Sequence, residues 1–176
     1  MLPQGSKKSD WEVELGIVIG SKATYVSVEE TLSFVAGYCV INDVSEREYQ
    51  MERCGIWDKG KGCDTFGPVG PWLTAADEVG DVQSLDLWLD VNDRRMQTGS
   101  TSKMIVNCAE IVSYVSRFMT LLPDDAIATG TPSGVGMGFK PDPIYLQPGD
   151  TMTVGIEKLG VQSQKVLAWS AEGAGI

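Results

Sequence analysis

The chain has 176 residues, of which 43% are hydrophobic and 22% charged, and its formal net charge is −10. This length and composition predict a single globular domain with a buried core. The acidic balance argues against nucleic acid and against an anionic membrane surface as partners, because both attract clustered Lys and Arg.

Two strands separated by a short helix are predicted near the N-terminus. Polar residues 1–10 form a loose lead-in, and the apolar run of residues 11–19 forms a strand that ends at a Gly-Ser-Lys turn. A Ser-Val-Glu-Glu capping box then predicts a helix over residues 28–35. A second, buried strand follows over residues 37–41.

The middle of the chain combines irregular segments with one hairpin. Residues 45–50 form a polar turn of helix, and the glycine-rich stretch 57–71 forms a long loop that its aromatic residues and prolines keep ordered. The alternating residues 85–91 predict a strand, and an Asn-Asp turn returns the chain as a second strand over residues 94–98.

One helix and three strands are expected in the C-terminal part. The helix spans residues 107–119 and carries an apolar stripe. Strands follow over residues 126–129 and 151–156, and residues 164–169 can pair with the latter, before a frayed tail at 171–176. The fold class that follows is β-rich α+β, one domain over the whole chain with about two short helices.

Two carboxylates open the first strand and a third follows the second. Because side chains alternate along a strand, Glu12 and Glu14 point from one face. Like charges this close repel and are costly to bury, so a positive partner is expected between them, and a divalent cation is the simplest. Asp43 supplies a third oxygen ligand if the two strands are neighbours. The alternative is a solvated strand edge, with Asp43 serving as a turn residue.

The sequence contains no histidine. A Ser-His-Asp triad and a Cys-His pair are therefore excluded within this chain, and so is the usual nitrogen ligand of zinc and copper. A metal site must rest on carboxylates, which prefer Mg²⁺, Mn²⁺ or Ca²⁺. The four cysteines form no C-x-x-C pair and no apolar run is long enough to span a membrane, so we predict free thiols and a cytoplasmic location.

Two glycine-rich segments offer groups for an anionic ligand. Lys61 lies in the first, and the hydroxyl and amide groups of Thr131 lie in the second. The second segment lacks the G-x-x-x-x-G-K-[ST] pattern, so we reject a nucleotide site there. The alternative for Lys61 is a merely solvated side chain.

Four segments, in this order, make the chain resemble the C-terminal catalytic domain of the fumarylacetoacetate hydrolase family. They are W-E-V-E-L-G-I-V-I-G at 11–20, I-N-D-V-S-E-R-E-Y-Q at 41–50, K-G-C-D-T-F-G-P-V-G-P at 61–71 and T-G-T-P-S-G-V-G at 129–136. The resemblance implies a mixed β-sheet roll. It also implies that Glu12, Glu14 and Asp43 bind Mg²⁺ or Mn²⁺. It further implies that Lys61 is catalytic and that Gln50, Lys61 and Thr131 bind the substrate.

The segment at 57–72 resembles the branch of the family that acts on 2,4-diketo-3-deoxy sugar acids, which is often labelled ureidoglycolate lyase. The resemblance thus implies a hydrolase that cleaves a C–C bond in a 2,4-diketo, acylpyruvate-type acid, with this small keto acid as its partner. It also implies a homodimer, in which Trp72, Trp88 and the stripe of the 107–119 helix are candidates for burial.

Family members carry an upstream segment whose His and Glu activate the attacking water. This chain begins after that segment, so we expect a shortened member that keeps the metal site and lacks the general base. The alternatives are an oxaloacetate decarboxylase, an isomerase or a sugar-acid dehydratase of the same family. A further alternative is a non-catalytic fragment that binds metal and keto acid.

Overall fold

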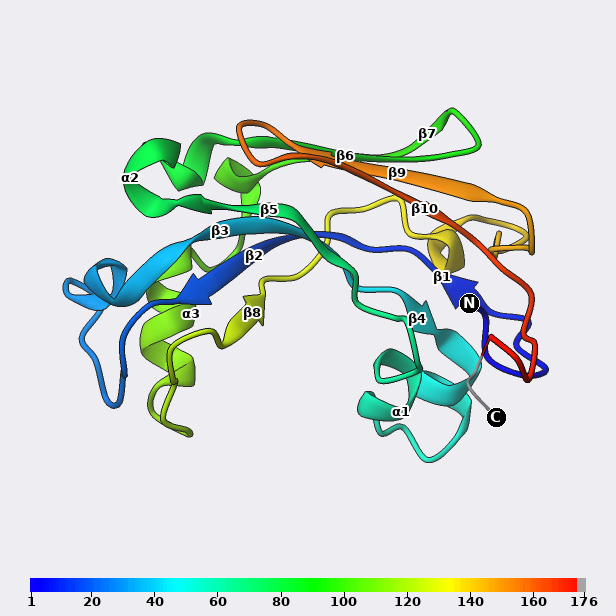
Figure 1. Cartoon of the computed structure of the whole chain (residues 1–176), viewed down its shortest axis with the longest axis horizontal. Coiled ribbons are helices and arrows are strands. Elements are labelled where there is room, and N and C mark those ends of the chain that lie inside the picture. The colour runs from blue at the N-terminus through cyan, green and yellow to red at the C-terminus, as the bar shows by residue number, and fades with distance from the viewer. Residues whose placement is uncertain (174–176) are drawn as a thin grey trace.

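Two four-stranded antiparallel sheets lie one over the other in the computed structural model, which describes residues 1–173 (Figure 1). The first sheet has the order β5 (Val69–Ala75), β3 (Val35–Asn42), β2 (Val13–Ile19), β8 (Ala126–Ala128). The second has the order β10 (Gly160–Lys165), β9 (Thr151–Ile156), β6 (Asp86–Val91), β7 (Arg94–Ser100). A third, two-stranded sheet pairs β1 (Ser9–Asp10) with β4 (Ser45–Glu46).

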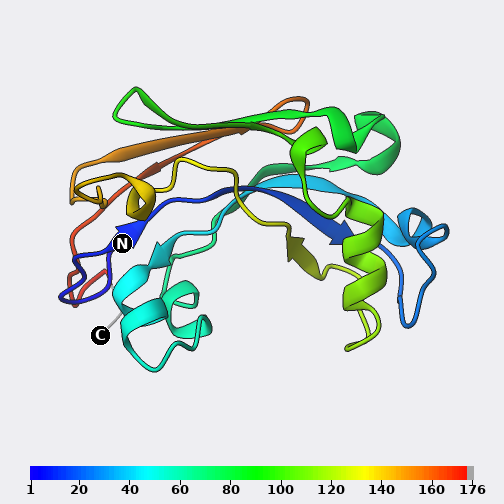
Figure 2. The same ribbon diagram turned by 180° about the vertical axis from the view of Figure 1, so that it is seen from behind.

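The helices are short. They are α1 (Asp58–Lys61), α2 (Ala76–Val79) and α3 (Cys108–Val115), with a π-helical turn at Glu48–Glu52 and 3₁₀ turns at Thr31–Phe34, Val82–Ser84, Thr101–Lys103 and Gly136–Gly138. Seen from behind, α3 lies at the same end of the molecule as β8 (Figure 2). No helix among residues 1–173 is long and apolar enough to cross a membrane.

The hydrophobic core lies between the two larger sheets. Alternate residues of β2, from Val13 to Ile19, are fully buried in one cluster with Leu89 of β6 and Val154 of β9. The strand therefore turns its apolar face to the second sheet. The opposite face of β2 carries Glu14, which places a carboxylate on the side of the sheet away from the core.

The fold class is confirmed as β-rich α+β with few short helices. The strands expected around residues 11–19, 37–41, 85–91, 94–98, 126–129 and 151–156 are present as β2, β3, β6, β7, β8 and β9. The expectation of a mixed sheet is wrong. Each strand pairing in the described residues is antiparallel.

The prediction of a helix over residues 28–35 is wrong. The Ser27 hydroxyl does donate to Glu30 at 2.8 Å, but a single 3₁₀ turn follows and Val35 already belongs to β3. Leu32 is half exposed, so a helix here has no apolar face to bury. The strand pairing of β3 therefore decides the conformation of this segment.

Two other boundaries also differ. The lead-in is not loose at its end, because Ser9 and Asp10 are fully buried in β1. The last strand is β10 rather than residues 164–169, because a tight hairpin from β9 sets its register. The expected tail extends beyond the described residues, which end at residue 173.

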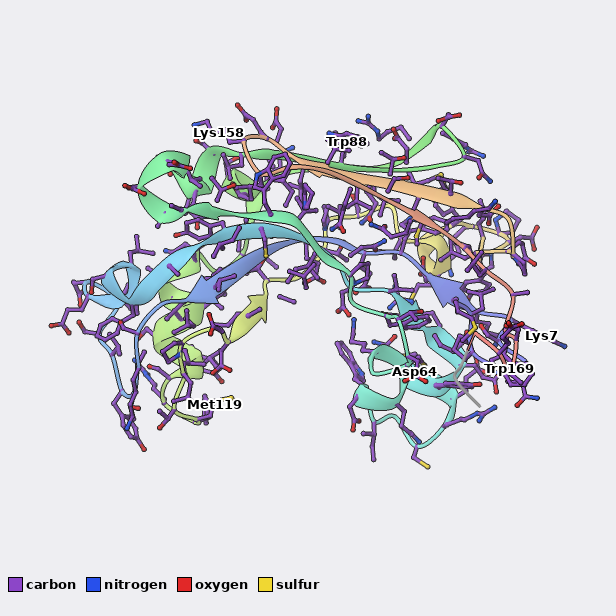
Figure 3. All side chains as sticks on the ribbon, viewed as in Figure 1. Lys7, Asp64, Trp88, Met119, Lys158 and Trp169 are labelled. Carbon is purple, nitrogen blue, oxygen red and sulfur yellow. The ribbon has the colours of Figure 1, made fainter. Side chains whose placement is uncertain are left out.

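The helix expected over residues 107–119 ends at Val115, and Phe118 is 68% exposed. Trp72 is 58% exposed, and the Trp88 ring stacks under the Arg95 guanidinium at 4.6 Å. In Figure 3, Trp88 lies on the upper sheet and Met119 lies at the far lower edge, beyond α3. Trp88 and Met119 thus lie on different parts of the molecule, and the homodimer stays a prediction.

Candidate metal centre

The register of β2 and β3 brings three carboxylates together. Val13 pairs with Asn42, so Asp43 lies opposite Glu12, and its amide donates to the Glu12 carbonyl at 2.8 Å. One carboxylate oxygen from each of Glu12, Glu14 and Asp43 lies within 4.8 Å of the other two. The sequence alone left open whether the two strands are neighbours, and the antiparallel pairing answers that question.

Glu14 is the most buried of the three carboxylates, with 3% of its surface exposed. Its Oε2 accepts a hydrogen bond from the Gly130 amide at 2.7 Å. Burial raises the pKa of Glu14 to about 7, and the negative charges of Asp43 and Glu12 act in the same direction. In the absence of a cation, the site therefore relieves its excess negative charge by holding a proton near neutral pH.

Lys61 enters the cluster from the last residue of α1. Its Nζ donates to Glu12 Oε2 at 2.9 Å, to Ser45 Oγ at 3.0 Å and to Asp43 Oδ2. Burial lowers the pKa of Lys61, but the hydrogen bonds to Asp43 and Glu12 outweigh it and raise the pKa above its ordinary value. Lys61 is therefore a fixed ammonium beside two of the carboxylates.

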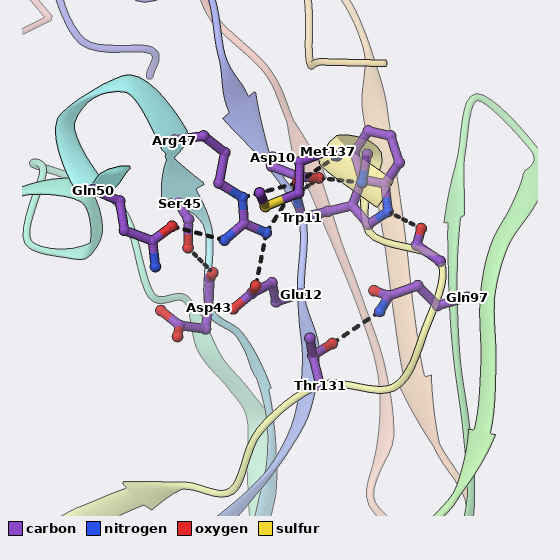
Figure 4. Close-up of polar contacts among 12 residues, drawn as sticks. Asp10, Trp11, Glu12, Asp43, Ser45, Arg47, Gln50, Gln97, Thr131 and Met137 are labelled. Atoms are coloured by element: carbon purple, nitrogen blue, oxygen red, sulfur yellow. Dashed lines mark hydrogen bonds and ion pairs between the residues drawn. The ribbon is translucent and has the colours of Figure 1, made fainter. Parts of the chain in front are cut away.

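A second cation, Arg47, also contacts Glu12 (Figure 4). Its guanidinium donates to Glu12 Oε1 at 2.7 Å and to Asp10 Oδ2 at 2.9 Å. A third bond, to Gln50 Oε1 at 3.0 Å, orients the Gln50 amide. Asp10 is fully buried and also accepts from the amides of Gly136 and Met137 at 2.6 and 3.0 Å. Glu12 is thus held between Arg47 and Lys61.

Thr131 lies beside the carboxylates, but its hydroxyl is already engaged. The Oγ1 donates to the Val13 carbonyl at 2.8 Å and accepts from Gln97 Nε2 at 2.8 Å. A carbonyl can only accept and an amide nitrogen can only donate, so the single hydroxyl hydrogen belongs to Val13. The hydroxyl therefore has no hydrogen to offer a carboxylate, which leaves the Thr131 main-chain amide for that role.

The charge and chemistry of this donor set fit a divalent cation. The connected groups comprise four carboxylates, from Asp10, Glu12, Glu14 and Asp43, and two cations, Lys61 and Arg47, so full ionisation leaves a formal charge of −2. Hard cations such as Mg²⁺ and Mn²⁺ take carboxylate oxygens. A divalent ion held by Glu12, Glu14 and Asp43 would neutralise the cluster.

All six residues expected in the site lie in or beside this cluster. The structure adds Arg47, Asp10, Gln97 and the Gly130 amide, which the sequence reasoning missed. Arg47 could have been found, because it stands alone among acidic residues three positions before Gln50. Asp10 was hidden in the expected lead-in, and Gln97 belongs to the other sheet, so no local pattern connects either to the carboxylates.

The fold and the cluster define a class: β-rich domains that bring three carboxylates capable of holding a metal ion together with a lysine. A sequence profile of the fumarylacetoacetate (FAA) hydrolase C-terminal domain matches residues 1–167. The chain therefore belongs to the fumarylacetoacetate hydrolase family.

Relatives and solved structures agree with this assignment. A protein of Burkholderia cenocepacia (strain HI2424), whose name assigns it provisionally to the hydrolases, is 58% identical over 164 residues, which are 93% of this chain and 58% of that protein. The fumarylacetoacetate hydrolase of psychrophilic Exiguobacterium antarcticum has 40% identity and a TM-score of 0.89 over 94% of this chain and 59% of its own. A 5-carboxymethyl-2-hydroxymuconate delta-isomerase from Mycobacterium smegmatis has 36% identity and a TM-score of 0.86 over 96% of this chain and 62% of its own. The chain thus spans a little under two thirds of the length of these proteins.

Proposed function

We propose that this chain is the metal-binding part of an Mg²⁺- or Mn²⁺-dependent hydrolase that cleaves a C–C bond in a 2,4-diketo acid. The observation that carries the proposal is the cluster of Glu12, Glu14 and Asp43 with Lys61 bonded to two of them. A divalent cation bound there would supply Lewis-acid polarisation of the α-keto carboxylate end of the substrate. The resemblance of residues 57–72 to the sugar-acid branch of the family supports an acyl group derived from a deoxy sugar acid.

In the proposed reaction, Lys61 stabilises the negative charge that develops on the keto-acid fragment as the C–C bond breaks. The raised pKa of Lys61 keeps it protonated, and its ammonium is already held in place by Glu12 and Ser45. All three ammonium hydrogens are used by Glu12, Asp43 and Ser45 in the metal-free chain, so we propose that a cation bound by Glu12 and Asp43 would free one of them for the substrate while Ser45 keeps the ammonium in place. Gln50, oriented by Arg47, and the Thr131 amide are proposed to hold the substrate carboxylate.

Water attack on the distal carbonyl needs a general base, and Lys61 and Arg47 cannot accept a proton. The 176 residues contain no histidine. We therefore expect the base to come from the family's His–Glu segment, and we expect this chain alone to bind substrate better than it hydrolyses it. Loss of a positioned base typically costs about 10²–10⁴ in rate.

Decarboxylation of oxaloacetate is a second candidate, and the same observation favours it. That reaction breaks a C–C bond next to the same α-keto acid group and requires no activated water. The cluster and Lys61 can therefore support it without a histidine. One solved structure of the same fold is named as a delta-isomerase, which supports weighing more than one reaction for this site.

The test is to titrate the 176-residue chain with Mn²⁺ by calorimetry, and then to titrate the Mn²⁺-loaded chain with oxalate. Acetylpyruvate hydrolysis and oxaloacetate decarboxylation are assayed in parallel with and without Mg²⁺. We expect Mn²⁺-dependent oxalate binding that Glu14→Gln weakens and that the exposed control Glu29→Gln leaves unchanged. We expect acetylpyruvate hydrolysis at least about a hundredfold below the roughly 10 s⁻¹ of a median enzyme.

Failure of Mn²⁺ to bind would refute the proposed function. Metal-dependent oxaloacetate decarboxylation that exceeds hydrolysis would support the second candidate instead. Hydrolysis near 10 s⁻¹ would show that a carboxylate of this chain serves as the base. Binding without either reaction would point to a keto-acid-binding domain.

A further inference from the structure

Gln97 is a fully buried polar side chain that comes from the sheet opposite the carboxylates. It lies on β7, with 0% exposure, and its side chain bonds to the segments that carry the site. Its Oε1 accepts from the Val13 amide at 3.0 Å, and its Nε2 donates to Thr131 Oγ1 and to the Pro132 carbonyl, both at 2.8 Å. Both amide hydrogens are thus used.

These bonds continue the first sheet where one of its strands stops. β8 pairs with β2 only from Gly16 to Val18, and the Thr129 amide adds one more bond, to the Leu15 carbonyl at 3.2 Å. Within residues 1–173, no main-chain group pairs with Val13 on that side. The side chains of Gln97 and Thr131 take over, and they satisfy the Val13 amide and carbonyl respectively.

The position of Val13 gives these bonds their importance. Val13 stands between the two carboxylates of the E-x-E pair, and Thr131 follows Gly130, whose amide binds Glu14 Oε2 at 2.7 Å. Gln97 therefore contacts both the strand that carries Glu12 and Glu14 and the loop that binds one of them. Figure 4 shows Gln97 and Thr131 joined beside Glu12.

The loop around Thr131 is also pressed against β7 by steric fit. A Cβ on Gly134 would lie 2.1 Å from the Met96 carbonyl oxygen, and a Cβ on Gly99 would lie 2.8 Å from Pro132 Cβ. Packing this close leaves no room for the loop to approach β7 further. The hydrogen bonds of Gln97 then fix how the loop sits along β2.

We propose that Gln97 is a positioning residue for the metal centre, acting through Thr131 and Val13. It keeps the Gly130 amide on Glu14 and keeps the Thr131 main chain beside the carboxylates. It does not touch the cation or the substrate itself. The ligand-binding part of this inference rests on the proposed function, and the effect on the loop does not.

The experiment compares the wild type with Gln97→Met, Thr131→Val, the double variant and the conservative control Thr131→Ser. Amide exchange of Gly130 is measured in the metal-free protein, with amides of β6 and β9 as internal references. In Gln97→Met we expect exchange of Gly130 to rise at least about tenfold while the reference amides stay unchanged. Oxalate affinity of the Mn²⁺-loaded protein should fall at least about tenfold, and Mn²⁺ affinity should fall less.

Thr131→Val should reproduce the loss in oxalate affinity, and Thr131→Ser should retain the wild-type oxalate affinity. The oxalate affinity of the double variant should be no worse than about twofold below that of either single variant, because the two side chains act as one unit. Single losses that multiply in the double variant would overturn the inference. Unchanged Gly130 exchange in Gln97→Met would also overturn it, whether or not oxalate binds the wild type. Absence of oxalate binding to the wild type, with faster Gly130 exchange in Gln97→Met, would refute the proposed function and leave the positioning role supported.

Discussion

Replacing Glu14 by glutamine should change how the stability of the metal-free protein depends on pH. Glu14 has a pKa of about 7 in the folded chain and 4.5 as an unperturbed group, chiefly because it is buried. Between these values the folded state holds a proton that the unfolded state has lost. The contribution of Glu14 to stability is therefore fully present below pH 4.5 and is lost as the pH rises through 7.

The size of the effect follows from that difference in pKa. One pH unit corresponds to about 1.4 kcal/mol, so the change from 4.5 to about 7 corresponds to about 3 kcal/mol. Glu14→Gln removes the titrating group and keeps its shape. Relative to the wild type, the variant should gain about 3 kcal/mol in free energy of unfolding between pH 4.5 and pH 8.

The assay is urea unfolding of the wild type, Glu14→Gln and the exposed control Glu29→Gln at pH 4.5, 6 and 8, with EDTA present. Taking the difference between variants cancels the titration of carboxylates that do not interact with Glu14. Mn²⁺ at pH 8 should stabilise the wild type more than the variant, because only the wild type offers the third carboxylate. A wild-type-minus-variant difference that stays constant across this pH range would show that Glu14 ionises normally and that the reasoning is wrong.

Three further results are expected. Lys61→Met should retain Mn²⁺ binding in calorimetry but reduce Mg²⁺-dependent turnover of oxaloacetate at least about a hundredfold. The reason is that no other ammonium adjoins Asp43 in the described residues, and normal turnover of the variant would contradict this role of Lys61. Asp10→Asn should lower the free energy of unfolding, measured in urea, by about 3 kcal/mol, because it leaves the buried Arg47 with less compensating charge. A loss below about 0.5 kcal/mol would contradict this role of the Asp10–Arg47 ion pair. Light scattering at micromolar concentration should give a dimer mass, and Trp72→Ser should lower it if that exposed ring lies in the contact; a monomer mass for the wild type would exclude the homodimer.

Sequence reasoning was successful where a local pattern determines the structure. The alternation around Glu12 and Glu14 is a property of one strand, and the Asn-Asp turn after β6 specifies its own hairpin. It failed at residues 28–35, where the Ser27 hydroxyl bonds to the Glu30 carboxylate instead of capping a backbone amide, and no helix forms. A cap stabilises a helix end, but no apolar face was available to bury the helix itself.

The missed site residues have a common physical cause. Asp10, Gln97 and the Gly130 amide act through contacts between segments that lie far apart in the chain, and the bond from Gln97 to Val13 spans 84 positions. Such contacts depend on which strands pair, how the loops after them are placed and how the sheets stack, and no periodicity encodes any of these. Lys61 and Thr131 were found from the glycine-rich segments around them, whereas Gln50 was found only because the motif around it resembles a known family.

Because β8 is synthesised long after β2 and β3, the bonds of the carboxylate cluster form at different times during synthesis. The bond between the Gly130 amide and Glu14 joins residues 116 positions apart. At about 5–20 residues per second, synthesis leaves the emerging chain for several seconds with Glu12, Glu14 and Asp43 already present and their later partners still missing. The hairpin of β2 and β3 can form in that interval, but its acidic end lacks the loop that binds Glu14. The bond between the Gly130 amide and Glu14 can therefore form only when the loop after β8 docks, so its formation during synthesis would report the completion of the fold rather than its beginning.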